Sequence, residues 1–341
     1  MEQTSVAIAI LWFFVFIYAI LGSIDFGAGF WAFIYGNRAD TRAASIANRF
    51  LSPSWKVTNV FLVLLVVALV GFFPRATFLL GTLLLLPVSL VLILLTVRST
   101  FLVYAYSSEK YSGALKVVSG VTGLLIPGLL LSVLPVTLGG FILVEGGYPQ
   151  LMLGKLFTSP TLYAHVAFGI CAELFISALF LSDYAREAED ETTYQTYRNI
   201  AIVIGPISLA TAVLATFAMN PEAHWMVVNM NANRMWFILS LIAFFIAYSA
   251  LWWRRRDGRL GHPRVAFTGT ILQYALASIG YGSAHMPYIV YPHLTVAEGF
   301  TNPSMFNSLL IGYSVGTIIL IPLFYWFWRL FMKDKRYLKQ E

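Results

Sequence analysis

The sequence AILGSIDFGAG, residues 19–29, places one carboxylate inside an otherwise apolar segment that extends from Val6 to Ile34. An ionised group at bilayer depth is costly unless it is paired, hydrated or protonated. Gly22 and Gly29 lie three residues before and four residues after Asp25, so on a helix the carboxylate shares its face with two residues that have no side chain. Such a face lets a second helix approach closely. The stretch therefore predicts a membrane helix whose acid meets a neighbouring helix.

The composition extends this prediction to the whole chain. Of the 341 residues, 59% are hydrophobic and 11% are charged, which is about half the charged fraction of a soluble protein. The mean hydropathy is +0.75, and several apolar runs reach the ~20 residues that a helix needs to cross a bilayer core. Glu2 stands where a cleavable signal would have a basic residue, so the first span is expected to remain in the protein. We expect an all-α polytopic membrane protein, with residues 1–341 forming one integral membrane domain.

Nine transmembrane helices can be drawn along the chain. The second and third are separated only by a few residues around Pro74, which is consistent with a tight helical hairpin. The fourth contains Pro127 and Pro135, so we expect it to be kinked toward its outer end. The predicted spans cover residues 6–34, 55–73, 77–97, 115–144, 160–184, 200–219, 235–253, 265–287 and 306–332.

The basic residues are unequally distributed between the two sides of the membrane that these spans define. Nine spans place all of the 22 basic residues on one side except Arg75, Lys155 and Arg234. The positive-inside rule then predicts an outer N-terminus and a cytoplasmic C-terminus. The segment 185–198 on the cytoplasmic side is acidic, and we interpret it as a solvated helical linker between two halves.

Four polar residues lie at membrane depth: Asp25, His165, Glu173 and His285. Each of the two acids is either a packing residue that bonds to a facing helix or a group that handles protons. His165 and Glu173 are eight residues apart on one helix, roughly 80° around it, so they cannot pair directly. His165 and His285 could form a haem couple, but both lie near the outer ends of their spans, and we do not expect haem ligation in this chain.

Motifs for other chemistry are missing from the sequence. The chain has no phosphate loop, nucleophile motif, zinc-binding HExxH or dinucleotide fingerprint. Its single cysteine, Cys171, excludes an intrachain disulfide and a thiolate metal cage. The basic residues lie in short loops beside apolar spans, so they indicate topology and not nucleic acid binding. On its residues alone, the chain has no self-sufficient active site, no metal site and no cofactor.

Several short motifs follow one another along the chain. In the first third these are Tyr18-Ala19-Ile20-Leu21, Asp25-Phe26-Gly27-Ala28-Gly29, Ser52-Pro53-Ser54-Trp55, Pro74 after the second span and Arg98 after the third. Near the end they are Pro287-Tyr288-Ile289-Val290, Pro292 and Leu294-Thr295. In their order and spacing, these motifs resemble those of subunit II of the cytochrome bd-type quinol oxidases, and the resemblance spans the chain with a matching number of helices.

The resemblance implies a subunit without haem that supports a partner, subunit I. In this family subunit I carries haem b and haem d and oxidises quinol, while O2 is reduced to water and a proton-motive force is generated. The resemblance also implies two four-helix bundles plus one peripheral helix in the bacterial cytoplasmic membrane, in contact with lipid and with a small single-helix subunit. Asp25 matches an acid position of the family. The structural or interface anchors that it implies are Gly22, Gly27, Gly29, Trp55, Arg98 and Pro287.

The chain departs from the family pattern directly after Trp55. Many members continue with Trp-Asp-Gly-Asn, whereas this chain has Trp55-Lys56-Val57-Thr58. A lysine thus replaces an acid proposed for proton entry, which argues against a proton channel through this position. Lys56 is kept with Asp25 and Glu173 as a polar residue of the membrane region.

Two other functions are compatible with the residues. A secondary transporter or channel could use Asp25 and Glu173 as coupling acids, although no internal repeat is detectable. A haem-binding membrane anchor could use His165.

Overall fold

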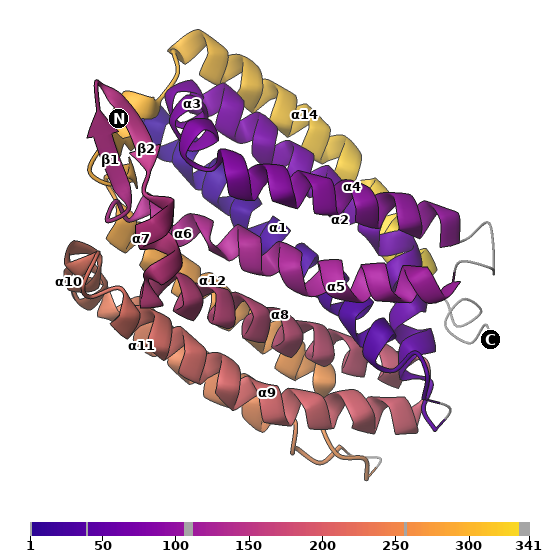
Figure 1. Ribbon diagram of the computed structural model, residues 1–341. Helices are drawn as coiled ribbons and strands as arrows, with labels where there is room; N and C mark the ends of the chain where they lie inside the picture. Colours follow the sequence, from indigo (N-terminus) through magenta and orange to yellow (C-terminus); the bar gives the residue numbers. More distant parts are fainter. Residues whose placement is uncertain (1, 39, 106–111, 256–257, 334–341) are drawn as a thin grey trace.

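Helix α1 (Glu2–Ile34) runs through the middle of the molecule and is the element around which the other long helices pack (Figure 1). This computed structural model describes residues 2–38, 40–105, 112–255 and 258–333. α1 contacts α2 (Ala43–Phe72), α5 (Ser112–Leu131) and α8 (Pro160–Glu187). The predicted first span, 6–34, is therefore one helix.

Helix α2 begins at Ala43, twelve residues before the span predicted at 55–73, and its part from Pro53 to Phe72 is the candidate membrane span. Pro53 lies inside the helix and removes one backbone donor. The turns before it hold nevertheless, because they are packed in the core. Ile46 and Phe50 are buried there, and the Tyr197 hydroxyl donates a hydrogen bond of 2.8 Å to the carbonyl of Ala43.

The next two predicted spans are divided by proline. The span predicted at 77–97 is two helices, α3 (Pro74–Leu83) and α4 (Leu85–Ala105), because Pro87 cannot donate to the carbonyl of Leu83. The span predicted at 115–144 is wrong at its outer end. α5 stops at Leu131, where Pro135 leaves the carbonyl without its helical donor, and α6 (Val133–Thr137) is a single short turn.

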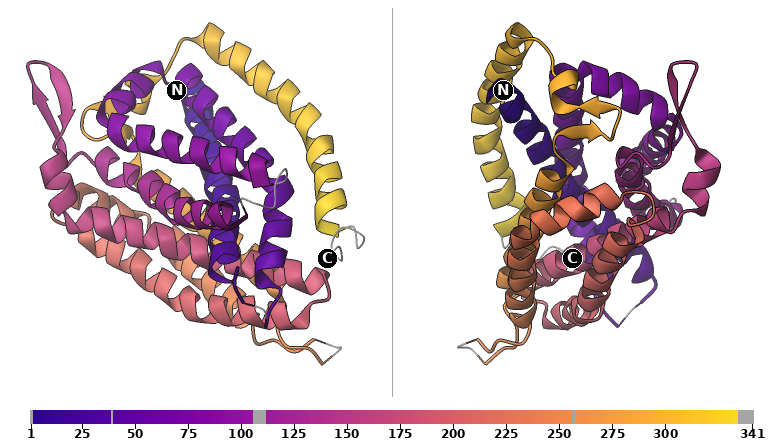
Figure 2. Two further views of the ribbon diagram at one scale, coloured as in Figure 1. Left: turned by 45° about the vertical axis from the view of Figure 1, so that its right-hand side comes forward. Right: turned by 90° about the vertical axis from the view of Figure 1, so that its left-hand side faces the viewer.

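A β-hairpin follows α6 and projects away from the helices (Figure 2). Strands β1 (Ile142–Glu145) and β2 (Tyr148–Leu151) pair antiparallel from Ile142 opposite Leu151 to Glu145 opposite Tyr148. The two-residue turn is Gly146-Gly147, both with positive φ (58° and 82°), as a tight hairpin with the twist of its strands requires. The short helix α7 (Leu153–Thr158) then leads into α8.

Helices α8 and α9 (Glu191–Ala218) form an antiparallel pair with a very short connection. The prediction of a solvated linker over 185–198 is wrong, because only residues 188–190 lie between the two helices. Acids in this segment and directly before it have partners. Arg264 lies 3.1 Å from Asp183 and 2.7 Å from Glu187, and the side chain of Asp190 caps α9.

The remainder of the chain alternates helices with short loops. Helices α10 (His224–Ala232) and α11 (Arg234–Ser249) are bent by 75° at their junction. The predicted spans 235–253, 265–287 and 306–332 correspond to α11, α12 (Pro263–His285) and α14 (Pro303–Trp328). The small elements are β3 (Tyr288–Val290), β4 (Leu294–Thr295), α13 (Val296–Gly299) and a π-helix at Arg329–Lys333.

Seven helices among the described residues are long and apolar enough to cross a membrane, and the bent pair α10–α11 makes an eighth if it counts as one span. α12 is not among them, because residues such as Gln273 and His285 lower its hydropathy. The chain is thus a mostly helical, multi-pass membrane protein. The seven are α1, the part of α2 from Pro53, α4, the joined α5 and α6, α8, α9 and α14.

Two groups of helices meet at α1. α1, α2, α4 and α5 pack together, and α8, α9, α11 and α12 pack together, with α8 against α1. α14 lies along the outside of the first group (Figure 2), and Phe306 is its one buried residue. The start of α1 and the end of α14 lie at opposite ends of the helices (Figure 1).

Candidate functional site

Asp25 lies where α1 meets α2 and α4, with 3% of its surface exposed. The Ser54 hydroxyl of α2 donates a hydrogen bond of 3.1 Å to Oδ1 of Asp25. The other oxygen, Oδ2, is 3.6 Å from Nη2 of Arg98 on α4. The same Nη2 donates to the backbone carbonyl of Asp25 at 3.0 Å. The acid predicted from sequence therefore joins three helices through one buried ion pair.

Arg98 extends this contact to a fourth helix. It is 2% exposed, and its Nη1 donates to the carbonyl of Ser119 on α5 at 2.7 Å. Longer bonds of 3.3 Å run from Nη1 to the hydroxyls of Ser119 and Thr122. The guanidinium also lies 5.2 Å from the centre of the Phe26 ring. We call Asp25, Ser54, Arg98, Ser119 and Thr122 the Asp25–Arg98 cluster.

Two glycines of α1 are required by this packing. A Cβ on Gly29 would lie 2.5 Å from the Ser119 hydroxyl and 2.8 Å from Nη2 of Arg98. A Cβ on Gly27 would collide with the side chain of Ser177 on α8. A Cβ on Gly22 would approach only the ring of Phe26, at 3.3 Å, on its own helix. Packing against neighbouring helices therefore requires glycine at residues 27 and 29 but not at residue 22.

Glu173 of α8 is completely buried and faces α1. Its backbone carbonyl would lie 3.5 Å from a Cβ on Gly27. Within the described residues, neither oxygen of its carboxyl group has a hydrogen-bond partner. Arg98 acts on it electrostatically, but that cation is already engaged by Asp25. As predicted, Glu173 does not bond to His165, whose Nδ1 lies 2.8 Å from the carbonyl of Thr161.

Trp55 lines a small cavity beside the cluster, together with Asp25, Asn59, Arg98 and Ser99. The cavity is about 10 Å³, which is enough for a single water molecule. The Trp55 Nε1 and the Arg98 Nε have no partner among the described residues, so a water there would find donors.

Lys56 is exposed and does not line this cavity. Its Nζ lies 5.8 Å from the centre of the Trp55 ring. The structure therefore does not bring Lys56 together with Asp25 and Glu173.

Both histidines that were considered as haem ligands lie in packed surroundings. His285 is packed among the rings of Trp225 and Tyr281, at centroid distances of 5.5 and 6.0 Å. His165 is 3% exposed and bonded within its own helix. No histidine lines the small cavity, and none lines a larger groove that lies on the surface between Trp31 and Ile200. The described residues also hold no group of three or more His, Cys, Asp or Glu that could bind a metal ion.

Pro287 lies in the loop between α12 and α13, away from the Asp25–Arg98 cluster. Its carbonyl accepts a hydrogen bond of 2.8 Å from the N–H of Val296, and the N–H of Tyr291 donates to the carbonyl of Thr137 at 2.9 Å. The loop is closed by a capping box in which Glu298 accepts from the backbone and hydroxyl of Thr295, and these bonds lower the pKa of Glu298. Pro287 thus belongs to a loop that connects the end of α12 to α6.

Sequence reasoning missed three members of the cluster: Ser54, Ser119 and Thr122. Single hydroxyl residues in apolar helices give little signal, because most of them bond to their own backbone. Only the buried charges indicated that such residues should exist, because Asp25 and Arg98 need hydrogen-bond donors and acceptors from neighbouring helices.

Comparison with known proteins gives matches over almost the whole chain. The family model for cytochrome bd terminal oxidase subunit II matches residues 3–331. A protein of Bacillus subtilis (strain 168) named "Putative cytochrome bd menaquinol oxidase subunit II" is 48% identical over 338 residues, which are 98% of this chain and 97% of that protein. A chain in the solved structure of bd oxidase from Geobacillus thermodenitrificans matches with a TM-score of 0.81 and 33% identity, covering 98% of this chain and 100% of that chain. These matches leave the transporter or channel hypothesis without support.

Proposed function

This chain belongs to the cytochrome bd terminal oxidase subunit II family, and from that premise we propose its part in the oxidase. It is a subunit of a membrane quinol oxidase, a complex in which haems and a partner subunit I take part. We propose that this chain binds no haem and that subunit I carries haem b and haem d. The 48% identity over 98% of the chain is the observation that carries the proposal.

The described residues hold no group of three or more His, Cys, Asp or Glu that could bind a metal ion. Of the two histidines at membrane depth, His165 is bonded through Nδ1 to its own helix and His285 packs against the ring of Tyr281. The part that we propose for the chain is therefore structural. Its long apolar helices give subunit I a surface to assemble on. We also propose menaquinol as the substrate of the complex, because that quinol is in the name of the Bacillus subtilis relative.

We further propose nine spans in two four-helix bundles with α14 as the peripheral helix, the N-terminus outside and the C-terminus cytoplasmic. The packing of α1, α2, α4 and α5 in one group and of α8, α9, α11 and α12 in another supports this arrangement. Exposed apolar side chains such as Phe78 (75%) and Ile318 (71%) are available to lipid or to a small single-helix subunit.

The two buried acids take different parts in this proposal. Asp25 stays ionised beside Arg98 and fixes α1 against α2, α4 and α5, so its role is to position helices. Glu173 has no donor for its oxygens among the described residues, and an ionised carboxylate would be very costly there. Glu173 is therefore neutral and is the acid that is free to exchange a proton. Lys56, which is exposed, takes no part in that exchange.

Purification of the complex and of the chain alone tests the proposal. The complex should show the absorption of haem b and haem d and oxidise menaquinol with O2. The chain expressed without subunit I should carry no haem. Stoichiometric haem on the isolated chain would contradict the proposal. A His165→Ala variant would then show whether His165 is the ligand.

A further inference from the structure

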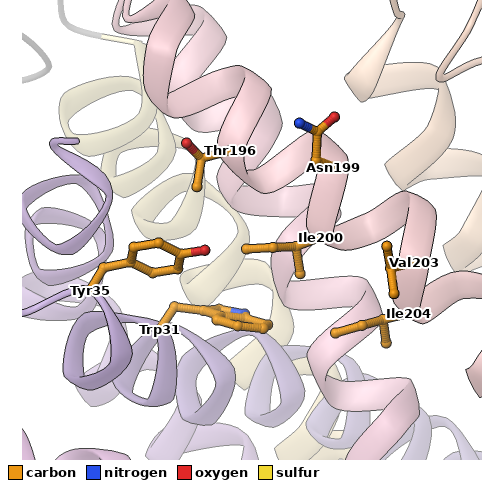
Figure 3. Close-up of a pocket in the computed structure, with 7 residues that line it drawn as sticks. All are labelled: Trp31, Tyr35, Thr196, Asn199, Ile200, Val203 and Ile204. Carbon is orange, nitrogen blue, oxygen red and sulfur yellow. The ribbon is translucent and has the colours of Figure 1, made fainter. Parts of the chain in front are cut away.

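A groove on the molecular surface separates α1 from α9 at the end of the molecule that carries the loop 35–42 (Figure 3). Its volume is about 500 Å³ and it is open to the outside. Trp31 of α1 and Tyr35, directly after the end of that helix, form one wall, and one face of α9 forms the other. The lining residues are Trp31, Tyr35, Thr196, Asn199, Ile200, Val203 and Ile204.

The polarity of the groove changes along its length. Thr196 and Asn199 stand at one end, whereas Val203 and Ile204 line the other (Figure 3). This order follows α9 from its first turns into its apolar part, along one helix face. A phospholipid has the same order of polarity, from headgroup to acyl chain.

One basic side chain lies beside a wall of the groove. The guanidinium of Arg38 lies 5.2 Å from the centre of the Tyr35 ring, and its side chain is exposed. Basic residues beside a membrane span attract anionic lipid headgroups, by about 1 kcal/mol for each cation at the surface.

The wall of the groove is held in place without a ligand. The Trp31 Nε1 donates to the Ser177 hydroxyl at 3.0 Å. Tyr197 lies edge-on to both Trp31 and Tyr35, at 6.4 and 6.3 Å, and its hydroxyl is bonded to Ala43. A rigid wall lowers the entropy cost of binding.

We propose that this groove binds one anionic phospholipid, with its phosphate beside Arg38 and Asn199 and an acyl chain along Ile200, Val203 and Ile204. The inference rests on the membrane embedding of the chain and not on its proposed part in the oxidase. The two can therefore fail separately, because haem content reports on one and bound lipid on the other.

Native mass spectrometry of the purified complex, exchanged into micelles with phosphatidylglycerol or phosphatidylcholine, tests the proposal. Wild type should retain one tightly bound phosphatidylglycerol. Val203→Trp fills the groove from a side chain that is 62% exposed, so it should remove that lipid without disturbing the core. Leu214→Trp is the matched control, since residue 214 is 55% exposed and lies about three turns further along the same face. It should retain the lipid.

The charge is tested separately. Arg38→Gln should lower the preference for phosphatidylglycerol over phosphatidylcholine by about fivefold, whereas Arg254→Gln in another exposed loop should not change it. Equal lipid retention in wild type and Val203→Trp would overturn the proposal. A photo-crosslinker on Val203→Cys, in a Cys171→Ser background, that attaches to subunit I or to a second copy would also overturn it, because a protein would then occupy the groove.

Discussion

Asp25 and Glu173 are both carboxylates in long apolar helices that pack against each other, and their surroundings are opposite. Asp25 accepts a hydrogen bond from Ser54 and lies 3.6 Å from the guanidinium of Arg98. Glu173 is 0% exposed and has no hydrogen-bond partner on either oxygen within the described residues. Among the described residues, Arg98 is the cation that acts on both acids, and it pairs with Asp25.

The difference shows two ways to keep an acid inside an apolar interior. A charged acid needs a counter-charge and hydrogen bonds, because an unpaired buried charge is very unfavourable. An acid without partners has to be neutral. The first kind fixes neighbouring helices, whereas the second can change its protonation without breaking a contact.

Of the substitutions that test this comparison, removal of Arg98 should change the free energy of unfolding most. Arg98→Met leaves Asp25 as a buried charge without its partner and should lower the free energy of unfolding of the complex by about 3–5 kcal/mol. Chemical denaturation of the purified complex measures it. Arg75→Met is the control, because Arg75 is an exposed arginine whose one bond, of 3.3 Å, is to a backbone carbonyl. A loss below about 1 kcal/mol for Arg98→Met would show that the ion pair does not fix the helices.

Neutralising the acid should cost somewhat less. Asp25→Asn can still accept from Ser54 and leaves Arg98 with its bonds to backbone carbonyls of α1 and α5. We expect a loss of about 1.5–3 kcal/mol, the range for hydrogen bonds to charged groups. The yield of assembled complex should fall, and turnover per assembled complex should be nearly unchanged. Turnover that fell while yield and stability stayed at wild-type level would instead assign Asp25 to the chemistry.

The close contact between α1 and α8 should be less sensitive. Gly27→Val forces a side chain into Ser177 and should destabilise the complex by about 1–3 kcal/mol. Gly316→Val on α14 is the matched control, since nothing lies within 4 Å of a Cβ there. Equal melting temperatures for the two variants would mean that α8 does not press on α1 at Gly27.

Glu173→Gln should have the smallest effect on stability, below about 1 kcal/mol. The variant keeps the shape and the neutral state of the side chain and breaks no contact within the described residues. The denaturation midpoint should stay near wild type. Any proton exchange through Glu173 should be lost, and turnover should then be slower because reduction of O2 consumes one proton for each electron. Strong destabilisation would mean that Glu173 is ionised and bonded.

The sequence was sufficient for the class of the protein and for one half of the site. Long apolar runs predict membrane helices because a bilayer demands them, and Asp25 stood out because charge is rare there. The helix boundaries at Ala43, Leu84 and Leu131 could not be predicted, because proline ended two helices but lies inside α2, α5, α9 and α14. In α2, tertiary packing around Phe50 decided the outcome.

The partners of Asp25 were less accessible to sequence reasoning. Arg98 was included only through the resemblance to the family, and its pairing with Asp25 depends on how α4 crosses α1. The lack of partners at Glu173 is a property of the packed helices, so no pattern in one helix could have revealed it. The resemblance in motif order gave the function correctly, because it did not require those contacts.

Infrared spectroscopy of the purified complex tests the contrast between the two acids most directly. A protonated carboxyl group in an apolar interior has a carbonyl stretching band that is separate from those of carboxylates and amides. That band should be present in wild type, remain in Asp25→Asn and disappear in Glu173→Gln. Loss of the band in Asp25→Asn, or its persistence in Glu173→Gln, would contradict the assignment of an ionised, positioning Asp25 and a neutral Glu173.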